Sequence, residues 1–301
     1  MIFAKSKPKK RITLRPMTTF SMLPASSFMT TNASLYIDEH LSFSATRVEE
    51  ESDYYELAWC DAEEIALLSS IVVGIHPDHG KAFLFPARWP FYLEDNGEDL
   101  SNPELLAEIV DTLKNEIAVR FASGKDTNSW EELPPFLKNR PYEFNSKLNS
   151  TEYHLFLFEH IKPNDTMLIR GLSHLLKCGM LRCLGRSFVD TACLEIYVSL
   201  EATLQIILNR LRLAGNPNPT NRDASNYLLS AFNEPAISER YYGEYYDDRI
   251  RAIHPNSRFG AAKFTPLYVD DLYMLYNDLL RTYEFLITGV PNSYMVYPTA
   301  R

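Results

Sequence analysis

The residues best suited to chemistry lie in the segment 245–260, which combines tyrosines, arginines and a histidine. Pro255 disfavours the helical conformation at His254, so we expect a helix to end there with the imidazole at its C-terminus. The negative end of the helix dipole favours an imidazolium at such a position. Residues 249–269 contain no acid, and their cations are Arg249, Arg251, Arg258 and Lys263. The local cationic surface is suited to binding a phosphate.

The spacing of these residues decides which of them can meet. Arg249 precedes His254 by five positions, about 140° round a helix, so the two converge only if the helix end unwinds or the partner comes from another subunit. Arg251 is three positions before His254 and shares its face more easily. A series of tyrosines precedes the cluster at helical spacing: Tyr241, Tyr242, Tyr245 and Tyr246. These rings could stack on bases, although such a series more often packs in a core or a dimer seam.

The C-terminal half resembles the HEPN domain, a bacterial helical module named for nucleotide binding in higher eukaryotes and prokaryotes, and particularly its Apea-like branch. The resemblance rests on the long helical segment containing 194–202, followed by Arg249-x4-His254, and covers about residues 187–289. It implies a helical bundle that dimerises and cleaves RNA without a metal through an Arg-x4-6-His motif. By this resemblance Arg249 is the motif arginine and His254 the motif histidine.

The resemblance predicts a metal-independent endoribonuclease of a bacterial toxin or defence system. Such cleavage needs a base near the ribose 2′-hydroxyl, an acid for the leaving oxygen and a cation for the phosphorane charge. A two-fold homodimer formed by the C-terminal domain would supply two copies of His254 and Arg249. The remaining phosphate or RNA contacts are expected from Arg251, Arg258, Lys263, Tyr245 and Tyr246. No metal and no cofactor is expected.

Two other hypotheses stay open. In the first, the C-terminal domain is a catalytically silent HEPN protein that binds nucleotide, RNA or a protein partner. In the second, the helical half only dimerises, and chemistry lies around His76 and His79, which have metal-ligand side chains. Because both histidines sit in one tight turn rich in proline and glycine, a turn without metal is favoured.

The charge is distributed unevenly along the chain. The net charge is -9, but residues 16–150 carry nine lysines and arginines against 23 acids, whereas the second half is nearly neutral. The N-terminal domain is therefore unsuited to be the nucleic-acid surface, and we expect it to meet a basic protein partner or to shield the Arg249–His254 groove. A basic cluster from Lys5 to Arg11 could be a nucleic-acid arm or a localisation tag, but such short basic segments most often form solvated tails, which is the favoured interpretation.

The hydrophobic pattern predicts an α+β N-terminal domain, residues 1–146, with this basic tail. Alternation with period two predicts strands at 41–45, 55–59 and 81–85. Asp61 and Glu64 resemble a capping box that opens a helix or a buried strand at 65–75. Ser101 and Glu104 form a second capping box, which opens a helix ending at Gly124, and residues 123–150 have the composition of a connector.

An all-α HEPN-like bundle is expected from residue 147 to 301, with its core at about 187–289. Its helices are expected at 166–178, 187–214, 223–232, 238–249 and 269–288, the first of them stopping at Gly179. The four cysteines form no metal-binding pair or disulfide framework. With no apolar run long enough for a signal core or a membrane span, a cytoplasmic protein without membrane contact is expected.

Overall fold

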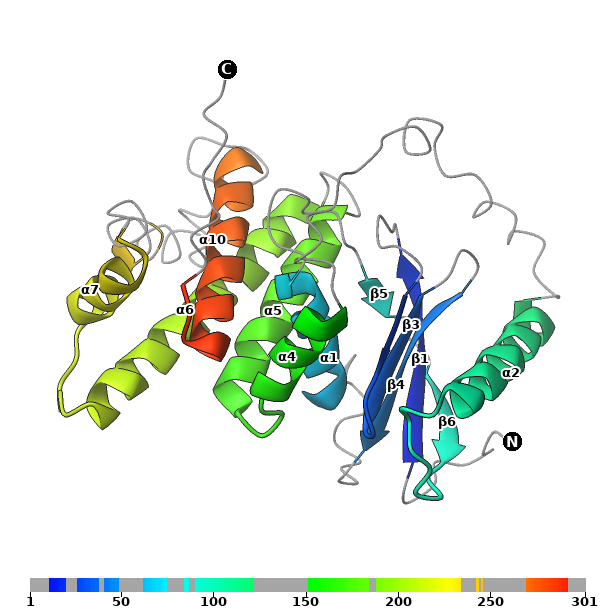
Figure 1. Cartoon of the computed structure of the whole chain (residues 1–301). Helices are drawn as coiled ribbons and strands as arrows, with labels where there is room; N and C mark the ends of the chain where they lie inside the picture. Colours follow the sequence, from blue (N-terminus) through cyan, green and yellow to red (C-terminus); the bar gives the residue numbers. More distant parts are fainter. Residues whose placement is uncertain are drawn as a thin grey trace. The chain divides into compact units, whose positions relative to one another are not determined.

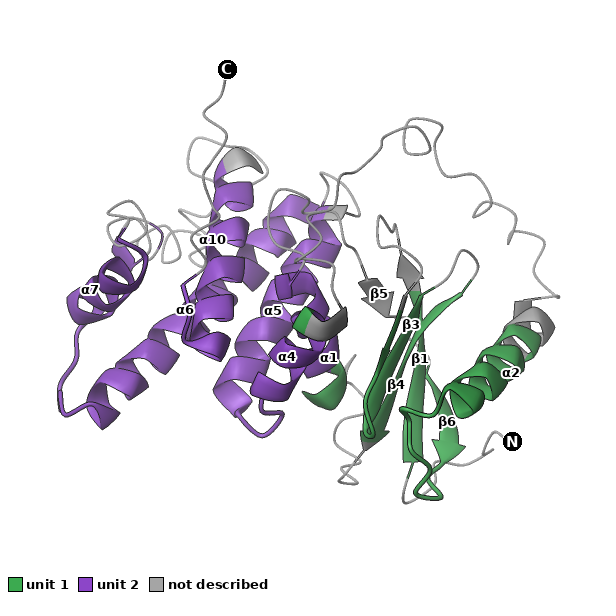
Figure 2. Cartoon of the chain, viewed as in Figure 1, with its two compact units in different colours: residues 1–18, 23–64, 86–153 green, residues 19–22, 65–85, 154–301 purple. Residues whose placement is uncertain are grey.

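Figure 1 shows the computed structural model of the chain. The structure describes the following residues: 11–19, 26–37, 41–48, 62–74, 84–86, 90–121, 151–183, 188–233, 242–243, 245 and 269–291. They belong to two compact units (Figure 2). Unit 1 comprises residues 1–18, 23–64 and 86–153, and unit 2 comprises residues 19–22, 65–85 and 154–301.

An antiparallel sheet and one long helix make up most of the described part of unit 1, and of the strand residues only Thr19, Leu84 and Phe85 belong to unit 2. The strands are β1 (Arg11–Thr19), β2 (Ser26–Met29), β3 (Ala33–Ile37), β4 (Ser42–Val48), β5 (Leu84–Pro86) and β6 (Phe91–Glu94), and the helix is α2 (Pro103–Phe121). Their order is β2-β3-β4-β1-β5, and β6 pairs with β1. Leu14 pairs with Ala45 of β4 and with Phe91 of β6, so these three side chains project to the same face of the sheet.

One face of the sheet packs against α2. The apolar core between them contains Ile12, Leu14, Phe43, Ala45, Leu93, Leu105, Ile109 and Leu113, among others. Helix α2 begins after Asn102, whose side-chain oxygen accepts a hydrogen bond from the Glu104 amide at 3.0 Å. The predicted cap at Ser101 is therefore wrong, because the Ser101 hydroxyl bonds to the Asp99 carboxylate instead.

The opposite face carries a buried row of polar side chains, here called the polar strip. Its members are Arg11, Thr13 and Arg15 of β1, and Ser42, Ser44 and Thr46 of β4. Helix α1 (Ala62–Gly74) begins beside it, and Arg15 Nε donates to Glu64 Oε2 at 2.9 Å. The Ser44 hydroxyl donates to the other oxygen of the same carboxylate. The buried Glu64 charge is thus held by a cation and a hydroxyl from two strands.

Unit 2 is built from helices. They are α4 (Thr151–His160), α5 (Thr166–Cys183), α6 (Val189–Leu213), α7 (Asn221–Phe232) and α10 (Val269–Thr288), together with the larger part of α1. Helix α5 packs along α6, and α10 and α7 also pack against α6. Thr220 and Asp223 form a reciprocal capping box that begins α7, and the hydrogen bonds from Thr220 lower the pKa of the Asp223 carboxyl.

Three helices meet at Gly171, Ser199 and Tyr283. The Tyr283 hydroxyl donates to the Ser199 carbonyl of α6 at 2.9 Å, and the Ser199 hydroxyl donates to the Gly171 carbonyl of α5 at 2.9 Å. A Cβ at Gly171 would lie only 2.0 Å from the Tyr283 oxygen. The absence of a side chain at Gly171 is therefore what lets α10 approach α5 and α6 so closely.

The expected order of an α+β region followed by a mostly helical region is confirmed. The strand at 41–45 and the helices at 187–214, 223–232 and 269–288 are also confirmed, with shifts of one to three residues at their ends. The strand at 55–59 and the boundary at 146/147 lie outside the described residues. Residues 65–74 form a helix, so of the two predictions for that segment the helix is confirmed and the buried strand is wrong.

Two expectations are wrong. Helix α5 does not stop at Gly179 but continues to Cys183. The glycine serves packing instead of ending the helix, because a Cβ there would lie 2.7 Å from the Tyr276 hydroxyl oxygen. Arg11 does not belong to a solvated tail, because it is a buried residue of β1, as is Arg15. Their charged side chains hid a strand from the search for apolar alternation.

Helix α6 has the length and the apolar composition of a membrane span. In the structure, 67% of its most apolar window is buried inside the protein, as in the core helix of a soluble protein.

Replacing Arg15 by leucine is expected to lower the free energy of unfolding by about 3–5 kcal/mol, because the Glu64 carboxylate would remain buried without its cation. Urea denaturation of the full chain measures this loss. The double variant Arg15→Leu/Glu64→Leu should recover much of it, because both charges of the pair are removed. Equal losses in the single and double variants would show that the ion pair does not determine the effect.

Replacing Gly171 by alanine is expected to destabilise unit 2 by about 1–3 kcal/mol through overpacking against Tyr283. The matched control is Gly243→Ala, since a Cβ at that exposed glycine has no neighbour within 4 Å. Thermal melts compare the two. In a Tyr283→Phe background the Gly171→Ala change should cost less, and an unchanged cost there would contradict this packing argument.

Candidate functional site

Most of the predicted site lies outside the described residues: Arg249, Arg251, His254, Arg258, Lys263 and Tyr246. His76 and His79 lie outside them as well. The structure describes the approach to the site, namely Tyr242 and Tyr245 before Arg249, and helix α10 after Lys263. These neighbours show how the unit fixes both ends of the segment that carries the motif.

Tyr242 attaches the chain before the motif to helix α6. Its hydroxyl donates to Thr203 Oγ1 at 3.0 Å, and Thr203 Oγ1 donates to the Leu200 carbonyl at 2.7 Å. The ring is buried, and this burial raises the pKa of the Tyr242 phenol, against the opposing effect of its hydrogen bond to Thr203. The Tyr242 phenol therefore serves as a neutral anchor, seven residues before Arg249.

Tyr245 is also buried, with 5% of its surface exposed. This burial is what the packing interpretation of the tyrosine series expects, since a base can stack only on an accessible ring. The contact to RNA predicted for Tyr245 stays a prediction.

Helix α10 carries an unusual set of buried polar side chains: Asn277, Asp278, Arg281, Thr282 and Glu284. The Arg281 guanidinium lies over the Phe232 ring of α7, with 5.2 Å between its carbon and the ring centroid. A buried charge is retained only where other groups compensate it, so these residues fix α10 in one orientation. Sequence reasoning missed them because Leu272, Leu275 and Leu279 already accounted for the helix as an amphipathic one.

A second pair with possible chemistry joins α5 to α6. His174 Nδ1 lies 2.5 Å from Glu195 Oε2, and both side chains are about a quarter exposed. A carboxylate on Nδ1 orients the ring and leaves Nε2 as the other site for proton exchange. Because the two residues are 21 positions apart, no local motif in the sequence indicates this pair.

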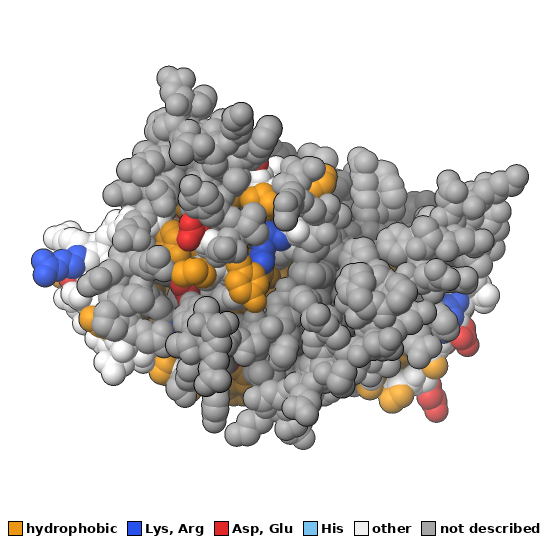
Figure 3. All heavy atoms as spheres, turned by 90° about the horizontal axis from the view of Figure 1, so that it is seen from above, with side chains coloured by type: hydrophobic (Ala, Val, Ile, Leu, Met, Phe, Trp, Pro, Cys, Tyr) orange, Lys and Arg blue, Asp and Glu red, His pale blue; other side chains and the backbone are white. Residues whose placement is uncertain are grey.

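The described residues contain no group of three or more His, Cys, Asp or Glu side chains that could hold a metal ion. On the face shown in Figure 3, apolar, basic and acidic side chains of these residues lie close to one another, and no single kind gathers there. Cys178 and Cys193 are both buried in unit 2, and neither forms a disulfide bond. Compared with protein-family models, curated proteins and solved structures, the chain gives no match.

Replacing Tyr242 by phenylalanine tests the anchor. An absorbance titration of the full chain should show one tyrosine fewer among those that ionise only on unfolding, because burial raises the pKa of Tyr242. The folded state keeps a proton that the unfolded chain releases above its ordinary pKa, about 10. This contribution to stability is therefore present below pH 10 and lost as the pH rises, and an unchanged titration would contradict the anchor.

Proposed function

We propose that unit 2 is a HEPN-type endoribonuclease of a bacterial toxin or defence system, which cleaves RNA in the cytoplasm without a metal ion. The observation that carries the proposal is the anchoring of Tyr242 on Thr203 of α6, just before the Arg249-x4-His254 motif. A buried anchor at this point is what a helical bundle needs if it is to hold a short catalytic motif in a fixed position.

The chemistry follows from the residue types. His254 has an ordinary pKa close to neutrality, so one copy can accept the proton of the ribose 2′-hydroxyl while the other donates one to the leaving oxygen. Arg249 stabilises the negative charge of the phosphorane. Because one protomer supplies only one histidine, the proposal includes a homodimer of unit 2.

The neighbouring cations complete the substrate site. Arg251, Arg258 and Lys263 bind phosphates along the RNA strand, and their combined charge makes the affinity depend on salt. Unit 1, which is acidic, recognises a basic protein partner or shields this cationic segment. Because residues 65–85 belong to unit 2, deleting residues 1–146 would remove part of the helical unit. The full chain is therefore the appropriate material for the test.

The test uses purified full chain, labelled single-stranded RNAs of varied sequence, and EDTA. We expect cleavage that leaves a 2′,3′-cyclic phosphate, and a loss of at least about a hundredfold in rate for His254→Ala and for Arg249→Ala. The matched control is Arg222→Ala, an exposed arginine of α7 outside the motif, which should keep the activity.

No cleavage across these RNAs would overturn the proposed activity. In that case a mobility-shift assay separates the remaining alternatives. Binding of RNA by the wild-type chain, together with loss of this binding in Arg249→Ala, would identify the catalytically silent alternative. Cleavage by the wild type that survives both substitutions would place the activity elsewhere.

A further inference from the structure

At the end of the polar strip in unit 1, the buried Arg11 forms no ion pair with any acid of the described residues. Arg11 is 6% exposed, and its Nε and Nη1 have no hydrogen-bond partner within the described structure. Its guanidinium carbon lies 4.9 Å from the centre of the Tyr92 ring. The hydroxyls of Thr13 and Thr46, which face each other in the β1–β4 register, have no partner there either.

The next position along the same strip shows what this combination of side chains holds. Arg15 pairs with Ser44 in the β1–β4 register, and both donate to the carboxylate of Glu64. Arg11 and the threonine pair repeat the same donor types nearby on the same face, since residues two apart in a strand project to one side. Near Arg11, however, no described acid takes the place of Glu64.

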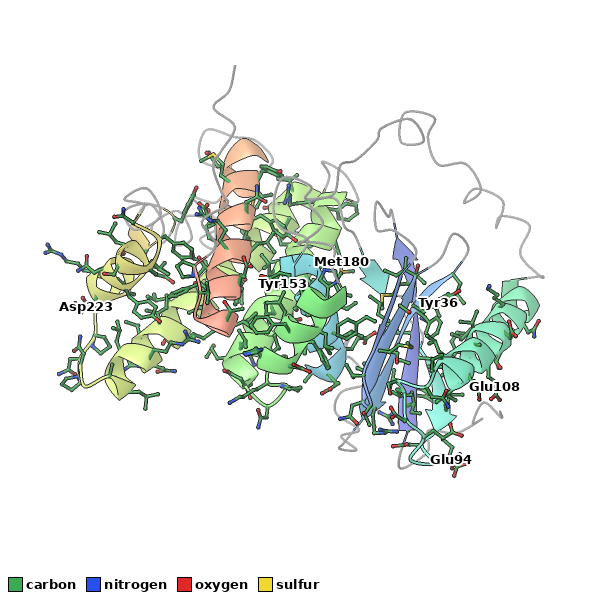
Figure 4. The ribbon with its side chains drawn as sticks, viewed as in Figure 1. Tyr36, Glu94, Glu108, Tyr153, Met180 and Asp223 are labelled. Atoms are coloured by element: carbon green, nitrogen blue, oxygen red, sulfur yellow. The ribbon has the colours of Figure 1, made fainter. Side chains whose placement is uncertain are left out.

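The other arginines of the sheet make the contrast clear. Arg47 on β4 bonds to the Asp95 carboxylate at 2.9 Å and also to Thr31 and Asn32. Glu94, labelled in Figure 4, lies directly across from Arg11 in the β1–β6 register. Its side chain is exposed, and it forms no ion pair with Arg11 in the described structure. Among the described arginines of the sheet, only Arg11 is not paired with a described carboxylate, although its guanidinium is buried.

Leaving these groups without partners is costly. A buried hydroxyl without a hydrogen bond costs about 1–3 kcal/mol, and a buried charge without a partner costs more. A single water can satisfy the two hydroxyls but cannot neutralise the guanidinium charge. The arrangement therefore favours an anion that accepts from several of these donors.

We propose that Arg11, Thr13 and Thr46 bind the phosphate group of a small ligand. The Nε and Nη1 donors lie on different edges of the guanidinium, so one of them can donate to the anion together with the two threonine hydroxyls of the same strip. A phosphate presents more acceptor oxygens than a carboxylate and so matches this set better. On the neighbouring strand, Glu94 is exposed and lies across from Arg11 in the β1–β6 register.

The same phosphate chemistry can come from free phosphate or from a nucleotide, so calorimetric titration of the full chain uses inorganic phosphate, AMP and acetate at constant ionic strength. We expect phosphate or AMP to bind, and acetate to bind at least tenfold more weakly. Whichever of the two binds identifies the source. The variant Arg11→Gln should weaken binding at least about tenfold, whereas Arg170→Gln, a change at an exposed arginine of α5, should leave it unchanged.

Two further variants separate ligand binding from a structural role. Thr46→Val keeps the shape but removes an unsatisfied hydroxyl, so it should raise the melting temperature of the ligand-free chain while it weakens phosphate binding. Glu94→Gln removes a nearby negative charge and should strengthen binding about threefold. The proposal is overturned if neither phosphate nor AMP binds, if acetate binds equally well, or if Arg11→Gln binds normally.

Discussion

The junction of Gly171, Ser199 and Tyr283 is the contact on which the described helical unit depends. It joins α5, α6 and α10 through two hydrogen bonds to backbone carbonyls, at a point where even a methyl group would not fit. Because it fixes α10 against α6, and Tyr242 is bonded to α6 as well, the chain is held on both sides of residues 246–268. A short motif needs such rigid flanks, since catalytic geometry is lost with small displacements.

Both units use buried polar groups to select one arrangement of their elements. Apolar packing alone tolerates small sliding of a helix or strand, whereas a buried charge that loses its partner incurs a large penalty. Glu64 can satisfy its carboxylate only where Arg15 and Ser44 meet. Arg281 is completely buried beside the Phe232 ring. These groups add little net stability, but they exclude competing registers.

The sequence predicts the elements whose signals are local and apolar. Helices α6 and α10 follow from leucines and isoleucines at helical spacing, and the strand containing Phe43 and Ala45 follows from alternation. Strand β1 was missed because its buried arginines read as charged surface, and their partner Glu64 lies 49 positions from Arg15. Gly179 was read as a stop because the sequence does not show that Tyr276 packs there. The Arg249–His254 site stays a prediction from a local motif, whereas the Tyr242–Thr203 anchor could not be predicted because it depends on a contact between distant segments.

The net charge of -9 gives little guidance to what each unit binds. Affinity for an anion depends on the charges within a few ångströms of it, because solvent and salt screen the more distant ones. Arg15 is neutralised inside the protein by Glu64, while no acid of the described residues pairs with Arg11 in the same strip. The proposed binding of an anion at Arg11 is therefore compatible with an acidic unit whose surface repels a nucleic-acid strand. The two kinds of recognition are compatible because one depends on a few desolvated donors and the other on the summed surface charge.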